Sequence, residues 1–326
     1  MRAFVTGATG FVGSHLVEAL AARGDEVTVL ARRPERAAPL ARCGVRVALG
    51  TLDDAAALAA AAQGADVVYH LAGLTAAARP DDFFQANESG TRRLVSAVRR
   101  AAPGLSRFVY VSSQAALGPS APGERLAEDA PCRPVTTYGR SKLAGEAVVR
   151  GADDVPWTIV RPPSVYGPRD REFLTMFRMI RRGLAPVFGT GRQEVSLVFA
   201  PDLADAIVRA GTTPAALHQT YHAAHAEAVR TRDLALAIGR AVGRRPLVLP
   251  VPGVLATPIV TAIGALSAAR GRPSVLNRDK MAEFLAPAWL LAVAKAEREL
   301  GWRAAHAVGE GTRLTAESYR ADGLLR

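Results

Sequence analysis

Lysine, cysteine and aromatic residues are all scarce in this chain of 326 residues. The two cysteines, Cys43 and Cys132, are too few and too arbitrarily spaced for a disulfide framework or a zinc site, so we expect no metal and a reduced, cytoplasmic protein. Residues 1–5 run straight into an apolar, strand-like segment and lack the charged region, apolar region and cleavage site of an export signal. The short arginine pairs lack the interleaved aromatic residues of a binder of single-stranded nucleic acid, which stacks bases on aromatic side chains.

The positive charge of the chain is carried almost entirely by arginine. The formal net charge is +11, yet lysine occurs only at positions 142, 280 and 295. A concentrated charge of this size would favour nucleic acid or an acidic membrane surface as a partner. Here the arginines are spread over nearly every segment in short pairs, which is typical of a solvated surface. We therefore expect no nucleic-acid partner, and Lys142 requires a specific explanation.

Residues 246–269 carry no charge and are as long as a membrane span. Three prolines and two glycines would interrupt a spanning helix where lipid offers the freed backbone no partner. The stretch therefore predicts a buried or pocket-lining helix, and an interfacial contact with a membrane is the alternative. A true span is disfavoured.

Short runs rich in β-branched residues alternate with longer helical patterns in the first half of the chain. We expect strands at residues 3–6, 27–30, 45–49, 67–71, 108–112 and 158–161, with helices in most of the gaps. This alternation predicts an α/β protein with a doubly wound parallel sheet of the Rossmann type. The carboxyl ends of its strands meet at one edge, where ligands bind.

After about Tyr166 the pattern becomes irregular, with proline-rich connections and no internal repeat. A further strand is expected at residues 220–223, and helices are expected at 233–242 and 290–300. We therefore predict a Rossmann domain formed by residues 1–165, to which 192–225 return. A smaller, partly interleaved C-terminal substrate-binding domain is expected to comprise 166–191 and 226–326.

A glycine-rich turn lies directly between the first strand and a helical stretch at residues 14–22. Gly7 allows the tight turn, Gly10 lets backbone N–H groups approach a pyrophosphate, and Gly13 lets the helix pack close to the sheet. Strand, turn and helix follow one another as dinucleotide binding requires. The turn residues predicted to bind the cofactor are Gly7, Thr9, Gly10, Phe11, Val12 and Gly13.

The end of the second strand bears on which nicotinamide cofactor is used. An NAD enzyme usually places an acid about 20 residues past the glycine turn, where it binds the ribose 2′-hydroxyl. Ala31 stands at that place here, and Arg32 and Arg33 follow it. Because an arginine fork can bind a 2′-phosphate, we predict NADP (NADPH), with NAD the less favoured cofactor.

Tyr138 and Lys142 are four residues apart, so on a helix they lie on the same face. Transfer of a hydride to a carbonyl leaves an alkoxide, which needs a proton at nearly the same moment. A phenol can supply it, and positive charge from Lys142 and an oxidised nicotinamide would favour the phenolate in the reverse direction. We therefore predict Tyr138 as general acid/base and Lys142 as its partner.

Together these motifs resemble the extended branch of the short-chain dehydrogenase/reductase superfamily, the NAD(P)-dependent epimerases and dehydratases. The resemblance covers most of the chain, through the glycine turn, the Tyr-x-x-x-Lys pair, His70-Leu71-Ala72-Gly73, Asn87-x-x-Gly90-Thr91 and the segments 161–168 and 199–204, where Phe199 replaces a frequent histidine. It implies that Ser113 orients the substrate oxygen and that Lys142 holds the nicotinamide ribose. The resemblance also implies a homodimer through the helices around Asn87 and Tyr138. The further cofactor-lining residues implied by it are Asp53, Leu71, Ala72, Gly73, Asn87, Pro162 and Val165.

Two positions depart from the family members that act on nucleotide sugars. Those members usually carry an asparagine where Ser164 stands and an arginine near Val195 that grips the diphosphate. The chain is therefore more similar to the branch of 3β-hydroxysteroid dehydrogenases and dihydroflavonol reductases. We predict an NADP(H)-dependent oxidoreductase that interconverts a ketone and a secondary alcohol on a mainly apolar small molecule. The alternatives are an NAD-dependent nucleotide-sugar epimerase or dehydratase and a non-catalytic NADP-binding sensor or scaffold.

Overall fold

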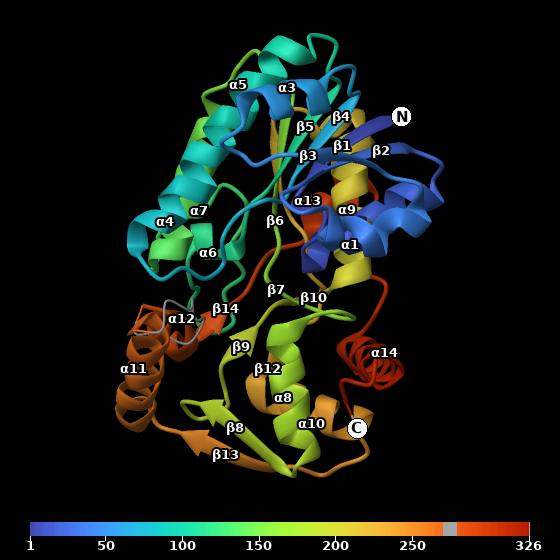
Figure 1. Cartoon of the computed structure of the whole chain (residues 1–326). Coiled ribbons are helices and arrows are strands. Elements are labelled where there is room, and N and C mark those ends of the chain that lie inside the picture. Colours follow the sequence, from blue (N-terminus) through green and yellow to red (C-terminus); the bar gives the residue numbers. More distant parts are fainter. Residues whose placement is uncertain (270–278, 326) are drawn as a thin grey trace.

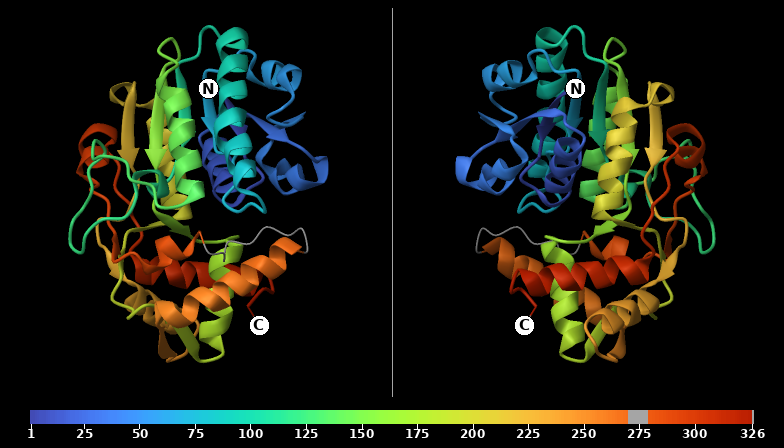
Figure 2. Two further views of the ribbon diagram at one scale, coloured as in Figure 1. Left: turned by 90° about the vertical axis from the view of Figure 1, so that its left-hand side faces the viewer. Right: turned by 90° about the vertical axis from the view of Figure 1, so that its right-hand side faces the viewer.

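The computed structural model describes residues 1–269 and 279–325 of the chain, which form two stacked halves (Figure 1). The upper half contains the N-terminus and a parallel sheet between two layers of helices, and the lower half contains the C-terminal helix and three small sheets. Figure 2 shows the same two halves from both sides.

The upper half is built on a seven-stranded sheet of order β11-β6-β5-β4-β1-β2-β3. Every neighbouring pair is parallel, and the four central strands are buried along nearly their whole length, which is typical of a sheet covered on both faces. The strands are β1 (Arg2–Thr6), β2 (Glu26–Ala31), β3 (Arg46–Leu49), β4 (Val67–His70), β5 (Arg107–Val111), β6 (Trp157–Arg161) and β11 (Gln219–His222).

Helices on each face of this sheet bury a separate apolar cluster. One face carries α1 (Phe11–Ala22), α9 (Ala200–Thr212) and α13 (Ala294–Leu300), and the other carries α3 (Ala55–Ala62), α5 (Gly90–Ala101) and α7 (Thr137–Arg150). Shorter helical segments are α2 (Pro34–Ala37), η1 (Ala38–Cys43), α4 (Pro80–Phe84), η2 (Gln85–Ser89), α6 (Gln114–Leu117) and η3 (Pro214–Ala216).

The lower half packs α8 (Arg171–Arg181), α10 (Thr231–Ala241) and α14 (Val308–Ala321) around a third apolar cluster. Parallel strands β8 (Leu184–Phe188) and β13 (Leu247–Val251) close its base. The other two small sheets of the lower half lie nearer the upper half and are formed by β7 (Ser164–Tyr166) with β10 (Leu197–Phe199), and by β9 (Glu194–Val195) with β12 (Val229–Arg230) and β14 (Ala288–Trp289). The helices α11 (Gly253–Ala269) and α12 (Met281–Leu285) flank them.

The predicted α/β fold and parallel sheet are confirmed, and the seven expected strands agree with the observed strands within one or two residues. The helix expected at residues 290–300 starts late, at Ala294. The preceding residues are extended because Leu290 and Ala292 pair with Leu126 through backbone hydrogen bonds of 3.1 and 2.9 Å. Residues 290–292 therefore pair with a loop far away in sequence instead of forming the first turn of the helix.

The expectation of a single buried or pocket-lining helix at 246–269 is wrong in part. The stretch opens with strand β13, because residues 247–251 pair with β8, and becomes helical only at Gly253. Among its described side chains, Ala256 and Val260 pack near Phe188, whereas Val254 and Leu255 are exposed. Within residues 1–269 and 279–325, no helix has the length and hydropathy required to cross a membrane.

The predicted division of the chain into 1–165 with 192–225, and 166–191 with 226–326, stays a prediction. Strand β11 and helix α9 belong to the upper half, in line with a return of the chain. Helix α13 also packs there, since Ala296 and Leu300 share the apolar cluster of α1 and α9. The chain thus crosses between the halves more often than the sequence pattern indicates.

Candidate active site

A cleft of about 1220 Å³ lies at the carboxyl ends of the parallel strands, with lining residues from both halves. Its upper wall contains the glycine turn, the ends of β4, β5 and β6, and one face of α7. Its lower wall is formed mainly by α8, β8, α10, α12 and β14. This position agrees with the rule that parallel α/β sheets bind ligands outside their carboxyl edge.

The glycine turn is held by close backbone contacts that leave no room for side chains. Gly7 has a φ of +76°, and a Cβ atom there would lie 2.6 Å from the backbone nitrogen of Ala72. A Cβ atom on Gly13 would lie 2.1 Å from the carbonyl oxygen of Gly7. Gly10 is the N-cap of the 12-residue helix α1, and the first residues of this helix line the cleft. This backbone cradle fits a dinucleotide pyrophosphate, which would approach the positive end of the α1 dipole.

Lys142 is buried in the first half of α7, beside the end of strand β5. Its Nζ donates a hydrogen bond of 2.8 Å to the carbonyl oxygen of Val111, at the end of β5, and lies 4.3 Å from the centroid of the Tyr110 ring. Burial lowers the pKa of Lys142 to about 7, and the charge of Glu146 only partly opposes this shift. The ammonium is therefore fixed at one place in the cleft and loses its proton more readily than a surface lysine.

Tyr138 lies one helical turn before Lys142 and faces the same cleft. Burial raises the pKa of its phenol to about 12, while a hydrogen bond with the Ser113 side chain lowers it. Near neutral pH the phenol therefore keeps its proton, which suits the donation of a proton to a developing alkoxide. The hydrogen bond with Ser113 lowers the pKa of Tyr138 by less than burial raises it. Formation of the phenolate, which the reverse reaction uses, therefore needs positive charge brought by a bound cofactor.

Asn87 connects the loop after β4 to α7 by hydrogen bonds. Its Nδ2 donates to the Ser141 hydroxyl at 2.9 Å and to the Leu74 carbonyl at 3.0 Å, and its Oδ1 accepts from the Leu74 N–H at 2.8 Å. Asn87 sits in η2, a single π-helical turn, and such turns are frequent at functional sites. A Cβ atom on Gly73 would lie 2.5 Å from Asn87 Oδ1, so the asparagine packs directly on the loop that follows β4.

A buried ion pair supports the same region from behind. Arg161 contacts both carboxylate oxygens of Glu146 at 2.8 and 2.7 Å, and the Ser112 hydroxyl donates to Glu146 at 2.6 Å. The three residues come from β6, α7 and the end of β5, so the contact fixes α7 on the sheet. The Arg161 guanidinium keeps the pKa of the Glu146 carboxyl below its usual value despite burial.

Most of the residues predicted from the sequence line this cleft. Ser113, Tyr138 and Lys142 come together at its centre, with the turn residues above them. Four predicted cofactor residues, Arg32, Arg33, Asp53 and Ala72, are not among its lining residues, and Asp53 is exposed and paired with Arg93 at 2.9 Å. The predicted residues that do line the cleft are Gly7, Thr9, Gly10, Phe11, Val12, Gly13, Leu71, Gly73, Asn87, Ser113, Tyr138, Lys142, Pro162 and Val165.

Several charged residues of the cleft were missed by the sequence interpretation. Arg36 lines it beyond the end of β2, and Arg169, at a φ of +72°, holds both carboxylate oxygens of Glu18. Lys280 Nζ lies 5.3 Å from the Tyr138 ring centroid and pairs with Glu283. The scarcity of lysine, which drew attention to Lys142, applies equally to Lys280 and was the available signal. No sequence pattern indicated Arg169, because its position depends on a backbone turn after β7.

The lower wall of the cleft is largely apolar. Its polar side chains are Asp170, Arg171, Glu172, Gln193, Thr231, Lys280 and Glu283. Apolar side chains supply most of the remaining surface, from Phe173, Met176, Pro186, Val187, Phe188, Val195, Leu197, Leu234, Phe284 and Trp289.

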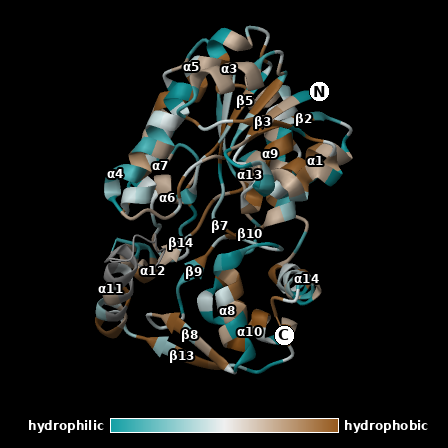
Figure 3. Cartoon of the chain, in the orientation of Figure 1, coloured by the Kyte–Doolittle hydropathy of each residue, from teal (hydrophilic) through white to brown (hydrophobic). Residues whose placement is uncertain are grey.

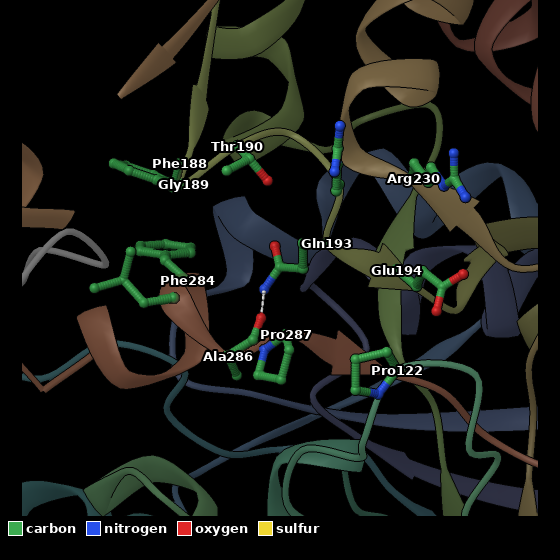
Figure 4. Close-up of a pocket in the computed structure, with 12 residues that line it drawn as sticks. Pro122, Phe188, Gly189, Thr190, Gln193, Glu194, Arg230, Phe284, Ala286 and Pro287 are labelled. Carbon is green, nitrogen blue, oxygen red and sulfur yellow. Dashed lines mark hydrogen bonds between the residues drawn. The ribbon is translucent and has the colours of Figure 1, made fainter. Parts of the chain in front are cut away.

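A second cavity of about 610 Å³, the outer pocket, adjoins this wall (Figure 4). It shares Phe188, Gln193 and Phe284 with the cleft, so these three side chains form the partition. The two phenyl rings stack at 4.9 Å between centroids, and Gln193 donates to the Ala286 carbonyl at 2.5 Å. The outer pocket and the cleft therefore meet at these three residues.

The fold and this constellation of a glycine cradle, a buried lysine and a tyrosine define an NAD(P)-dependent enzyme of the short-chain dehydrogenase/reductase class. When bound, the nicotinamide cofactor supplies or accepts the hydride. Within residues 1–269 and 279–325, no group of histidine, cysteine, aspartate and glutamate side chains is arranged to hold a metal ion. The model of the NAD dependent epimerase/dehydratase family matches residues 3–224, and the chain belongs to this family.

The relatives include enzymes with different substrates. A ceramide reductase of Caulobacter vibrioides is 33% identical over 325 residues, which cover 98% of this chain and 95% of the relative. A 3β-hydroxysteroid dehydrogenase/isomerase of Mycobacterium tuberculosis is 29% identical, covering 92% of this chain and 85% of the relative. The solved structure of a Thermus thermophilus UDP-glucose 4-epimerase with NAD is 26% identical, with a TM-score of 0.77 over 98% of this chain and 99% of that one.

Proposed function

We propose that the protein is an NADPH-dependent reductase that interconverts a ketone and a secondary alcohol on a mainly apolar substrate. The observation that carries this proposal is the apolar lower wall of the cleft, in which Val195 is one of the lining residues. Members of the family that bind nucleotide sugars usually have an arginine near this position. Around Val195 the wall offers a diphosphate no arginine, whereas its apolar side chains remove a hydrocarbon group from water.

Two of the relatives support the same substrate class. The names ceramide reductase and 3β-hydroxysteroid dehydrogenase/isomerase both denote oxidoreductases with lipid substrates. The ceramide reductase matches along nearly the whole of both chains, including the lower half that forms the substrate wall. We therefore infer that the substrate is a lipid ketone or alcohol whose hydrocarbon part contacts Phe173, Phe284 and their neighbours.

The proposed chemistry assigns one role to each central residue. The Ser113 hydroxyl orients the substrate oxygen, and the Tyr138 phenol donates its proton to that oxygen as the carbonyl carbon is reduced. Lys142, fixed on Val111, binds the nicotinamide ribose. In the opposite direction Tyr138 accepts the alcohol proton.

The choice of NADPH rests on the arginines after β2. Ala31 leaves the 2′ position without a competing carboxylate, and Arg32, Arg33 and Arg36 follow within five residues. Arg36 lines the cleft, while Arg32 and Arg33 are exposed beside it in sequence. A 2′-phosphate would gain charge-assisted hydrogen bonds from one or more of these forks. We further propose a homodimer through α5 and α7, as in the resembled family.

A direct test compares substrates by the change in nicotinamide absorbance. Purified protein with NADPH should reduce long-chain or polycyclic ketones, and UDP-glucose should neither react nor raise the melting temperature. Stabilisation by UDP-glucose, or protein that retains tightly bound NAD after purification, would favour a nucleotide-sugar epimerase instead. Binding of NADPH without turnover of any ketone or alcohol would favour the sensor.

A further inference from the structure

The base of the lower half exposes an unusual concentration of large apolar side chains. Leu247 is 62% exposed, Val254 is 82% exposed and Leu255 is 58% exposed. We call this surface the basal face; it comprises Leu184, Leu247, Leu249, Val254, Leu255 and Leu285. These six are half of the large apolar side chains that are exposed in the described part of the chain, so they are not scattered at random.

The basal face is continuous because its residues are neighbours in the fold. Leu184 and Leu247 are paired across β8 and β13, and Leu249 lies on the same face of its strand as Leu247. Strand β13 leads through one residue, Pro252, into α11, whose first turn carries Val254 and Leu255. A Cβ atom on Gly253 would lie 2.9 Å from Leu285, so α12 joins the same surface. Figure 3 shows hydrophobic colour along β8, β13 and the lower end of α11.

Apart from α12, where Glu283 is paired with Lys280, the segments that carry this face bear charge of only one sign. Residues 173–193 and 234–269 contain seven arginines and no lysine, aspartate or glutamate. Arg182, Arg244 and Arg245 are exposed, immediately before β8 and β13. Around β8, β13 and the start of α11 the basal face is therefore an apolar surface with only arginines as charged neighbours in sequence, whereas arginine elsewhere in the chain is interspersed with acids.

We propose that the basal face docks on the surface of a membrane that contains anionic lipids. Exposed apolar side chains enter the boundary of the acyl region, while arginines beside them contact lipid phosphates. A second copy of the chain fits this face poorly, because apposing two such faces would bring their arginines together without acids to pair with. The absence of a helix that could span a bilayer in the described residues is consistent with docking on the surface.

The position of the basal face gives the docking a use. Leu285 belongs both to this face and to the outer pocket, which shares Phe188, Gln193 and Phe284 with the cleft. A lipid leaving the bilayer would meet the outer pocket first and the apolar wall of the cleft next. Docking therefore shortens the aqueous path of an apolar substrate, although this use rests on the proposed function.

The test measures flotation of the full chain, with NADPH present, on vesicles of phosphatidylcholine with and without phosphatidylglycerol. The protein should float with the anionic vesicles, and added salt should weaken this binding. Leu247→Glu with Val254→Glu should reduce the partitioning of the protein onto the vesicles at least about tenfold. Burial of one valine or leucine side chain contributes about 1.5 kcal/mol or more, which corresponds to a tenfold change in binding. Arg244→Gln with Arg245→Gln should reduce it about 30-fold on anionic vesicles.

The matched control is Leu49→Glu with Leu217→Glu, which places the same charges at exposed apolar positions of the upper half. This control should float like the unaltered protein. Equal flotation of all variants, or no flotation on anionic vesicles, would overturn the proposal. If the basal-face variant instead converts a dimer to a monomer in sedimentation velocity, the face is a subunit interface and the proposal is also wrong.

Turnover separates the docking from the proposed activity. Both basal-face variants should reduce a short, water-miscible ketone at the normal rate, since their substitutions lie outside the catalytic cleft. Reduction of a long-chain ketone supplied in vesicles should fall with the loss of flotation. Flotation without any ketone reduction would reject the proposed function and leave the docking standing.

Discussion

The upper and lower walls of the cleft are built in different ways. In the upper wall, backbone meets backbone: a Cβ atom on Gly13 would lie 2.1 Å from Gly7, and Lys142 is held by the carbonyl of Val111. In the lower wall, side chains from residues 172 to 289 converge, and the partition to the outer pocket consists of two stacked rings and one amide. The upper wall is therefore suited to one fixed ligand, whereas the lower wall can be altered by single side chains.

The largest expected effect concerns the proton donor of the upper wall. Tyr138→Phe should lower kcat by about 10²-fold to 10⁴-fold, because the phenol supplies a proton rather than binding energy. NADPH affinity, measured by fluorescence titration, should change little. The matched control is Tyr221→Phe. It removes a hydroxyl on strand β11 that donates a hydrogen bond to Glu299 of α13, and this variant should retain turnover. Normal activity of the Tyr138 variant would contradict the proposed mechanism.

The next effect sharpens the cofactor side of the comparison. NADPH should bind more tightly than NADH by roughly 10-fold to 150-fold, since a charge-assisted hydrogen bond contributes about 1.5 to 3 kcal/mol. Ala31→Asp with Arg32→Ser should invert the preference, because the carboxylate accepts from a free 2′-hydroxyl and repels a phosphate. Titration of both cofactors measures this. If Arg36, which lines the cleft, binds the 2′-phosphate, Arg36→Ser alone should weaken NADPH binding and leave NADH binding unchanged.

A smaller effect tests the backbone packing of the upper wall. Gly13→Ala should destabilise the protein by about 1 to 3 kcal/mol and weaken cofactor binding, because the added methyl forces the turn away from α1. Gly104→Ala is the control, since a Cβ atom there meets nothing within 4 Å. It should lie within about 0.5 kcal/mol of the unaltered protein in urea unfolding. Equal effects of both variants would mean that the close contact at Gly13 is unimportant.

The smallest expected effect depends on pH. Burial lowers the pKa of Lys142 from 10.5 to about 7, so between these values the unfolded chain binds more protons than the folded protein. Stability contributed by this residue therefore rises with pH across that window. The stability advantage of Lys142→Met over the unaltered protein should shrink by about 1 kcal/mol or more between pH 6 and pH 9. A constant difference in urea unfolding at both pH values would show that the ammonium is not buried as described.

Features that depend on local sequence could be predicted, whereas features that depend on contacts between distant segments could not. The seven strands, the glycine turn and the pair Tyr138 and Lys142 could all be predicted, because each depends on a few consecutive residues or on a fixed helical spacing. The boundaries near residues 246 and 290 could not be predicted. There the chain pairs with β8 and with Leu126, which lie about 60 and 165 residues away in sequence, and such pairing overrides local helix preference.

The sequence by itself determined the α/β class, the family and the presence of Tyr138 and Lys142 in one cleft with the glycine turn, because local backbone geometry and a helix repeat leave little choice at Gly7, Gly13, Tyr138 and Lys142. Only the tertiary structure decided that Arg36, Arg169 and Lys280 lie in the cleft. It also decided that the uncharged stretch after residue 246 forms part of an exposed basal face rather than a wall of the cleft. The physical reason is that side-chain burial is a sum over contacts from distant segments, and no local pattern in this chain records it.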